Sequence, residues 1–288
     1  MSGGEAHRLI QTLRRQFLLA SLTRSILLVI IALSFVFGAL WRADAAYRAE
    51  LMWSISSVAA IAWVVLTFYS VRQVRAAHQA SGFIASGRLD LAEDKLKSTI
   101  RQFSLYRNAK LLACHHLAVV AHGRKSYQAA AELCDGMISL PGSPPMATLR
   151  TCRILLADCR LLLGDVVAAR QAIAPLKLRG PELNLAEQLL LLPIELRCQI
   201  TAEQYDEAAE SLAWKVKRAE LLDSPTAGLV HALLAIAADH TDQLQIAAFL
   251  RRRADLYHGL AELAAEHDFL RDLAPELVRT ADPTGLPG

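Results

Sequence analysis

Two long runs of apolar residues, 17–41 and 51–71, stand out near the start of the chain. The first run is interrupted only by Arg24 and a few hydroxyl groups, and the second contains no charged residue. A membrane-spanning helix needs about 20 predominantly apolar residues, so each run predicts a span. The short connector between them predicts an antiparallel transmembrane hairpin over 17–71, preceded by a basic segment over 1–16.

An export signal is the alternative interpretation of the first run. Arg14-Arg15-Gln16-Phe17-Leu18 is similar to a twin-arginine signal, and Ala43-Asp44-Ala45 would suit a cleavage site. However, the apolar core of a signal peptide is usually only about 7–15 residues long. A second apolar run also follows closely. Both points favour a helix that stays in the membrane.

The arginines near the two spans predict their orientation. Three arginines precede the first span and three follow the second, whereas two lie in the connector: Arg8, Arg14, Arg15, Arg72, Arg75 and Arg88 against Arg42 and Arg48. Loops rich in Lys and Arg stay in the cytoplasm. We therefore expect a multi-pass protein of the inner (plasma) membrane with both termini in the cytoplasm.

From residue 72 onward the apolar residues recur at helical spacing, and no segment alternates as a strand would. This pattern predicts an all-α domain over 72–279, followed by a disordered tail over 280–288. No proline separates the second span from the first helix of this domain, so both are expected to form one helix from Leu51 to about Ser86.

A repeated pattern runs through this domain. A turn residue is followed two positions later by a large residue and, three positions further on, by alanine. The large residues are separated by 38, 39, 39 and 39 positions; they are Leu89, Tyr127, Val166, Tyr205 and Leu244, with the alanines Ala92, Ala130, Ala169, Ala208 and Ala247. Such regular spacing indicates repeated helix pairs that stack on one another.

The pattern resembles the tetratricopeptide repeat (TPR) family, in which each unit has a helix, a tight turn and a second helix that begins with a small residue. The resemblance implies a TPR-like α-solenoid of about five helix pairs. The units here are longer than the usual repeat of about 34 residues. The chain also lacks the family's Trp-Leu-Gly-Tyr signature.

Charge is divided unevenly along the chain. Residues 1–74 carry a net charge of +4 and residues 75–288 a net charge of −1, which together give the overall +3. The basic excess therefore lies at the predicted membrane border, where anionic lipids attract it. The remainder has no basic excess of the kind that nucleic-acid binding requires, so we expect no nucleic-acid partner.

The cysteines, the histidines and the other residues that commonly serve in catalysis or metal binding form no recognisable motif in this sequence. The odd number of cysteines and the absence of CxxC spacing suit a reducing compartment. No carboxylate or cysteine completes a metal-ligand set around Cys114-His115-His116 and His122. There is no P-loop, GxGxxG, GxSxG or HExxH motif. We therefore predict no enzymatic activity, no cofactor and no metal.

The resemblance to TPR proteins also implies a binding groove, formed by fixed positions on the first helix of each pair. These positions are mostly apolar here, with a few polar points, and the candidate residues are His115, Val119, His122, Ile154, Asp158, Leu161, Arg197, Ile200 and Ile236. Such a groove suits an amphipathic helix or an apolar peptide of a protein partner. The alternative is that tight coiling or the C-terminal helix fills it.

These features predict a membrane-anchored scaffold or adaptor that recruits a protein partner to the membrane or organises a complex there. One alternative is an accessory factor of a membrane-associated biosynthetic pathway, because the layout resembles that of the HemY proteins. Another is a homo-oligomeric membrane component assembled through its spans, in which the small residues Ser56 and Ala60 allow close helix packing.

Overall fold

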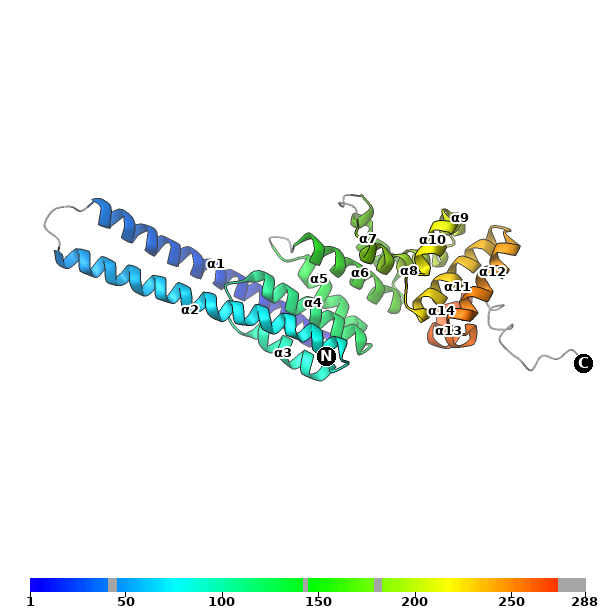
Figure 1. The fold of residues 1–288 in the computed structure, drawn as a ribbon, viewed down its shortest axis with the longest axis horizontal. Coiled ribbons are helices and arrows are strands. Elements are labelled where there is room, and N and C mark those ends of the chain that lie inside the picture. Colours follow the sequence, from blue (N-terminus) through cyan, green and yellow to red (C-terminus); the bar gives the residue numbers. More distant parts are fainter. Residues whose placement is uncertain (41–45, 142–144, 179–182, 274–288) are drawn as a thin grey trace, which may run out of the picture. The chain divides into compact units, whose positions relative to one another are not determined.

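The computed structural model describes residues 1–40, 46–141, 145–178 and 183–273 (Figure 1). Within these ranges the chain forms 14 α-helices and no strand, which confirms the predicted all-helical fold. The predicted disordered tail over 280–288 and residues 42–45 of the predicted connector lie outside the described residues.

The first two helices are long, and each of the later helices has 17 residues or fewer. They are α1 (Gly3–Leu40), α2 (Ala46–Ala85), α3 (Leu89–Arg101), α4 (Arg107–Gly123), α5 (Tyr127–Ile138), α6 (Met146–Leu162), α7 (Val166–Leu178), α8 (Leu185–Thr201), α9 (Tyr205–Ala209), α10 (Leu212–Ala219), α11 (Ser224–His240), α12 (Leu244–Tyr257), α13 (Leu260–Glu266) and α14 (Asp268–Leu273).

The chain divides into two compact units, Met1–Cys159 and Arg160–Gly288. The first unit contains α1 to α5 and most of α6, and the second contains α7 to α14. The two apolar helices therefore belong to the same compact unit as the helices that directly follow them, instead of forming a separate body.

Five turns of one geometry join successive helices. Each turn contains one residue in the left-handed backbone region, with φ between 57° and 80°: Gly87, Lys125, Gly164, Glu203 and Asp242. The next residue donates its backbone N–H to the carbonyl five positions earlier, as from Gln204 to Gln199 at 2.9 Å. This bond satisfies a carbonyl that the end of the first helix leaves unpaired.

The helix after each turn begins at the large residue of the repeated pattern, so α3, α5, α7, α9 and α12 start at Leu89, Tyr127, Val166, Tyr205 and Leu244. The alanine three positions later has no exposed surface in any of the five: Ala92, Ala130, Ala169, Ala208 and Ala247. Alanine is small enough to let two helix backbones approach closely, so a larger side chain would overpack these positions.

Helix α2 runs without interruption from Ala46 to Ala85, and this confirms that the second apolar run and the first helix of the repeated pairs form one helix. Helix α1 lies beside it (Figure 1, dark blue and cyan), and both extend beyond α3, α4 and α5. Two of the described helices are long and apolar enough to cross a membrane.

The exposed apolar side chains of α1 from Leu18 to Val36, and of α2 from Trp53 to Val71, form an apolar belt on the two helices. Residues 18–36 and 53–71 are 19 positions each. At a rise of about 1.5 Å per residue the belt is roughly 28 Å tall. This height matches the hydrocarbon core of a bilayer, about 30 Å.

The start of α1 packs into the first unit. Ala6, Leu9, Ile10 and Leu13 are buried, with at most 6% of their surface exposed. A Cβ added at Gly136 of α5 would lie 2.6 Å from the Cγ1 atom of Ile10, so glycine makes room for α1 there. The predicted basic segment over 1–16 is therefore the first part of a helix that completes the core of this unit.

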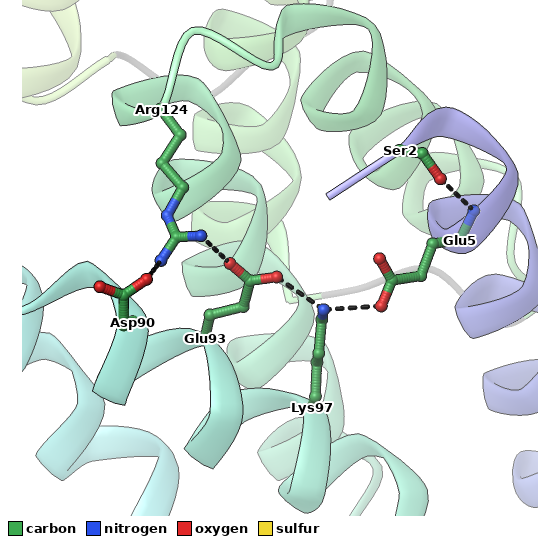
Figure 2. A network of polar contacts seen from close by, with 6 residues as sticks. All are labelled: Ser2, Glu5, Asp90, Glu93, Lys97 and Arg124. Carbon is green, nitrogen blue, oxygen red and sulfur yellow. Dashed lines mark hydrogen bonds and ion pairs between the residues drawn. The ribbon is translucent and has the colours of Figure 1, made fainter.

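Figure 2 shows a chain of ion pairs that ties the same part of α1 to α3 and to the end of α4. Lys97 bridges Glu5 and Glu93, with N–O distances of 2.6 Å to each carboxylate. Arg124 pairs with Glu93 at 2.7 Å and also with Asp90. The hydrogen bond from Lys97 lowers the pKa of the Glu5 carboxyl below its ordinary value.

The loop between α3 and α4 is held by side chains of α1 and α2. Gln16 donates to the carbonyl of Arg101 at 2.7 Å, and Gln73 donates to the carbonyl of Phe103 at 2.6 Å. The hydroxyl of Ser70 accepts the backbone N–H of Leu105 at 2.9 Å. This loop is therefore fixed close to the end of the apolar belt.

The left-handed turns generate a stability test. Gly164 has a φ of 80°, and no atom lies within 4 Å of a Cβ added there. Gly164→Ala should therefore lower the free energy of unfolding by about 1 kcal/mol through backbone strain alone. Gly82 in α2 has equally open surroundings, and there Ala should stabilise by about 0.5–1 kcal/mol. Unfolding in detergent micelles measures both; changes of the same sign would contradict the turn geometry.

Candidate partner-binding site

Most apolar residues of the predicted groove lie inside the protein. Ile154, Leu161, Ile200 and Ile236 are each at most 5% exposed, and Val119 is half-buried. In the second unit, Ile200 and Ile236 belong to a core cluster with side chains of α11, α12 and α13. These residues therefore contribute to packing, and they do not form an open apolar floor.

His122 and Asp158 form a polar contact between α4 and α6. The Nε2 atom of His122 lies 2.7 Å from Oδ2 of Asp158, and both side chains are about one-third exposed. The His122 ring also lies against Tyr127, with 5.4 Å between the ring centroids. The two predicted polar points thus interact with each other across successive helix pairs.

Arg197 lies in the second unit, on α8. Its guanidinium donates to the carbonyl of Leu161 at 3.1 Å and stacks over the ring of Phe269, 4.0 Å from the centroid. Phe269 belongs to α14 and also packs against the core cluster of this unit. At this position α14 covers the residue that the sequence predicts for the groove.

His115 on α4 is half-buried and lies beside His116, with 5.9 Å between the ring centroids. Burial, and secondly the neighbouring His116, lowers the pKa of His115 to about 4. The neutral imidazole is therefore the stable form at neutral pH. His115 acts as a packed side chain and not as a charged recognition point.

All five cysteines are buried and free: Cys114, Cys134, Cys152, Cys159 and Cys198. The hydrogen bond with Cys152, together with burial, raises the pKa of the Cys134 thiol, and burial raises that of Cys198 to about 11. Thiols in this state are poor nucleophiles and poor metal ligands. Among the described residues, no group of three His, Cys, Asp or Glu side chains is arranged to hold a metal ion.

A break in the second helix of the fourth pair was not expected from the sequence. Helix α9 ends at Ala209, and Ser211 takes a left-handed conformation with φ of 53° before α10 begins at Leu212. The ammonium of Lys215 donates to the carbonyls of Glu207 and Ala208 at 2.9 and 2.8 Å. These bonds satisfy backbone groups that the break leaves unpaired.

The break borders a cleft of about 390 Å³ between α8 and α9–α10, which we call the α8–α10 cleft. It is lined by apolar groups of α8, one aromatic ring, three carboxylates and one ammonium group: Leu192, Leu196, Trp214, Glu195, Glu207, Glu210 and Lys215, together with Gln199 and Ser211. Trp214 is 48% exposed, and the Oε1 atom of Gln199 is buried without a hydrogen-bond partner. The cleft therefore offers an aromatic surface and an acidic rim.

The sequence contains little to indicate this cleft. No glycine or proline lies between Tyr205 and Ala219, so the segment is typical of one continuous helix. The single signal is Trp214, a large aromatic residue at a position that faces solvent.

No protein-family model, no curated protein and no solved structure matches this chain. The resemblance to TPR proteins rests on the period of the sequence and on the resulting order of helices and turns.

The lowered pKa of His115 generates a test of pH dependence. The unfolded chain binds a proton at this residue near pH 6.5 and the folded chain only near pH 4. Stability should therefore fall as the pH is lowered from 6.5 to 4, by an amount on the order of 2 kcal/mol for this group. His115→Leu should reduce the slope of unfolding free energy against pH in this window without removing it, because burial also lowers the pKa of His231 to about 4. Parallel profiles for the two proteins would contradict the assignment.

Proposed function

We propose that this chain is a membrane-anchored scaffold whose TPR-like solenoid of about five helix pairs binds a protein partner and holds it at the membrane. The observation that carries this proposal is the continuity of α2, which passes from the apolar belt into the first helix pair without a break. A continuous helix transmits position and angle, whereas a flexible linker would not.

Several contacts of the first unit support a rigid connection. The buried residues at the start of α1 pack against the same unit as α3 to α5. Gln16, Ser70 and Gln73 hold the loop between α3 and α4 beside both apolar helices. This arrangement suits an anchor that holds the first helix pair at a fixed distance from the bilayer.

The surroundings of the α8–α10 cleft indicate what kind of partner segment it would accept. Glu210 and Glu207 are exposed at its edge, whereas Glu195 also pairs with Lys177 at 3.0 Å. An acidic rim next to an aromatic ring attracts a segment with a Lys or Arg beside an apolar side chain. Exposed tryptophans are also frequent anchors of protein interfaces.

The arginines at the ends of the apolar belt support a hairpin with both termini in the cytoplasm of a cell bounded by a plasma (inner) membrane. Arg14 and Arg15 precede the belt on α1, and Arg72 and Arg75 follow it on α2. In this orientation the helix pairs and the α8–α10 cleft face cytoplasmic partners.

Reporter fusions test the orientation. Alkaline phosphatase is active only outside the cytoplasm, so a fusion after Gly288 should be inactive and a fusion within residues 43–49 should be active. A fluorescent protein that folds only in the cytoplasm should give the opposite pattern. Active phosphatase after Gly288 would overturn the cytoplasmic assignment.

Site-specific crosslinking tests the cleft. A photoreactive phenylalanine analogue in place of Trp214 should crosslink one partner protein in native membranes. The same analogue in place of Phe249, an aromatic residue of similar exposure on α12, should not. Glu210→Lys should reduce the adduct at position 214, because it reverses a charge at the rim, without lowering the melting temperature.

Other outcomes of this experiment separate the alternatives. An adduct with a second copy of the chain would favour a homo-oligomeric membrane component. Equal adducts at positions 214 and 249, or none at either, would remove the cleft as the binding site.

A further inference from the structure

A cavity of about 310 Å³ lies beside α1 in the first unit, at the level where the apolar belt begins. We call it the border cavity. Its walls combine apolar side chains with the cationic groups of three arginines: Phe17, Leu18 and Leu105, with Arg14, Arg24 and Arg107.

The border cavity has an unbalanced positive charge. No carboxylate is among the described residues that line it, and Arg14 has a neutral partner, the hydroxyl of Ser139 at 3.0 Å. Within the described part of the chain, no ion pair joins Arg14, Arg24 or Arg107 to an acidic residue. Three cations at one cavity repel one another, so an anion bound there would relieve this repulsion.

Arg107, the first residue of α4, has donors that lack an acceptor. Its Nε and Nη2 atoms are shielded from solvent and have no hydrogen-bond partner. The guanidinium lies over the ring of Phe17, 4.9 Å from the centroid, and desolvation lowers its pKa. Shielded cationic donors without acceptors are costly, so a shift of this side chain toward an anion in the cavity would give these donors the acceptors they lack.

The position of the border cavity indicates the source of that anion. Leu18, 65% exposed, lines the cavity and is also the first residue of the apolar belt. Arg24 lies six residues further along α1, roughly 9 Å deeper. Helical side chains point back toward the helix N-terminus, so Arg24 reaches toward the cavity and the headgroup level. A lipid whose headgroup occupied the cavity would have its acyl chains beside the belt.

We propose that the border cavity binds the phosphate headgroup of an anionic glycerophospholipid, held by Arg14, Arg24 and Arg107. The planar guanidinium of Arg107 presents paired donors that match phosphate oxygens. Phe17, Leu18 and Leu105 cover the glycerol and the upper acyl chains. The proposal rests on the membrane insertion proposed above and adds a specific lipid to it.

Native mass spectrometry of the full chain, released from micelles of detergent mixed with phosphatidylglycerol or phosphatidylcholine, tests this site. The wild-type chain should retain phosphatidylglycerol, and Arg107→Gln should retain about 10-fold less, because one charge-assisted hydrogen bond of the usual strength is lost. Arg107→Lys should recover part of the retention. Arg15→Gln removes an equally basic residue of α1 that does not line the cavity, and it should bind like the wild type.

Melting temperatures with and without lipid provide a second readout. Phosphatidylglycerol should raise the melting temperature of the wild-type chain and of Arg15→Gln, but not that of Arg107→Gln. Without lipid, Arg107→Gln should lower the melting temperature only slightly, because it loses the contact with the ring of Phe17 but no hydrogen bond from Nε or Nη2. An equal rise of the melting temperature with phosphatidylglycerol in Arg107→Gln and in the wild type would overturn the proposal.

The remaining outcomes separate the possible ligands. Equal retention of phosphatidylcholine, or equal retention of phosphatidylglycerol by Arg107→Gln and Arg15→Gln, would overturn the anionic lipid site. Stabilisation by inorganic phosphate at matched ionic strength, equal to that by phosphatidylglycerol, would replace the lipid by a free anion. Extraction of the chain from membranes by alkaline carbonate would overturn the insertion itself, whereas an inserted chain without lipid selectivity would overturn only this site.

Discussion

The burial of one alanine near the start of the second helix of each pair is the constraint on which the repeated part of the structure depends. Each of these alanines is fully buried, and each stands five residues after a backbone turn of left-handed conformation. The turn fixes the direction in which the second helix leaves, and the alanine removes the side chain that would keep the two backbones apart. The other residues of each pair can then vary in size, provided that the left-handed turn residue and the alanine are kept.

The first unit combines this principle with a long apolar helix, α1, whose start is part of its core. Ion pairs from Glu5 to Asp90 tie the start of α1 to α3 and α4, and the buried apolar residues beneath them exclude water. Glu93, at the centre of these pairs, is only 6% exposed, and the cost of desolvating a buried ion pair offsets much of its attraction. Apolar burial therefore contributes most of the stability of this contact.

The helices and the turns between paired helices could be predicted from the sequence, because the apolar runs and the repeated pattern of turn residue, large residue and alanine each lie within a short stretch of chain. The burial of α1 also has a signal in the sequence, since Ala6, Leu9, Ile10 and Leu13 follow helical spacing. The arginines among them indicate the topology and say nothing of this packing. The pairing of His122 with Asp158 depends on how successive pairs stack, which local patterns do not specify. The left-handed Ser211, which opens the α8–α10 cleft, has no glycine, proline or asparagine to indicate it.

The burial of α1 against α5 also constrains the order in which the chain can be assembled. During synthesis α1 emerges first, yet Ile10 has no contact with Gly136 until α5 has been made. In the meantime the apolar face of α1 is exposed to water or to chaperones. The core of the first unit is therefore completed by a contact between its first helix and α5, and this contact can form only after both long apolar helices have been made.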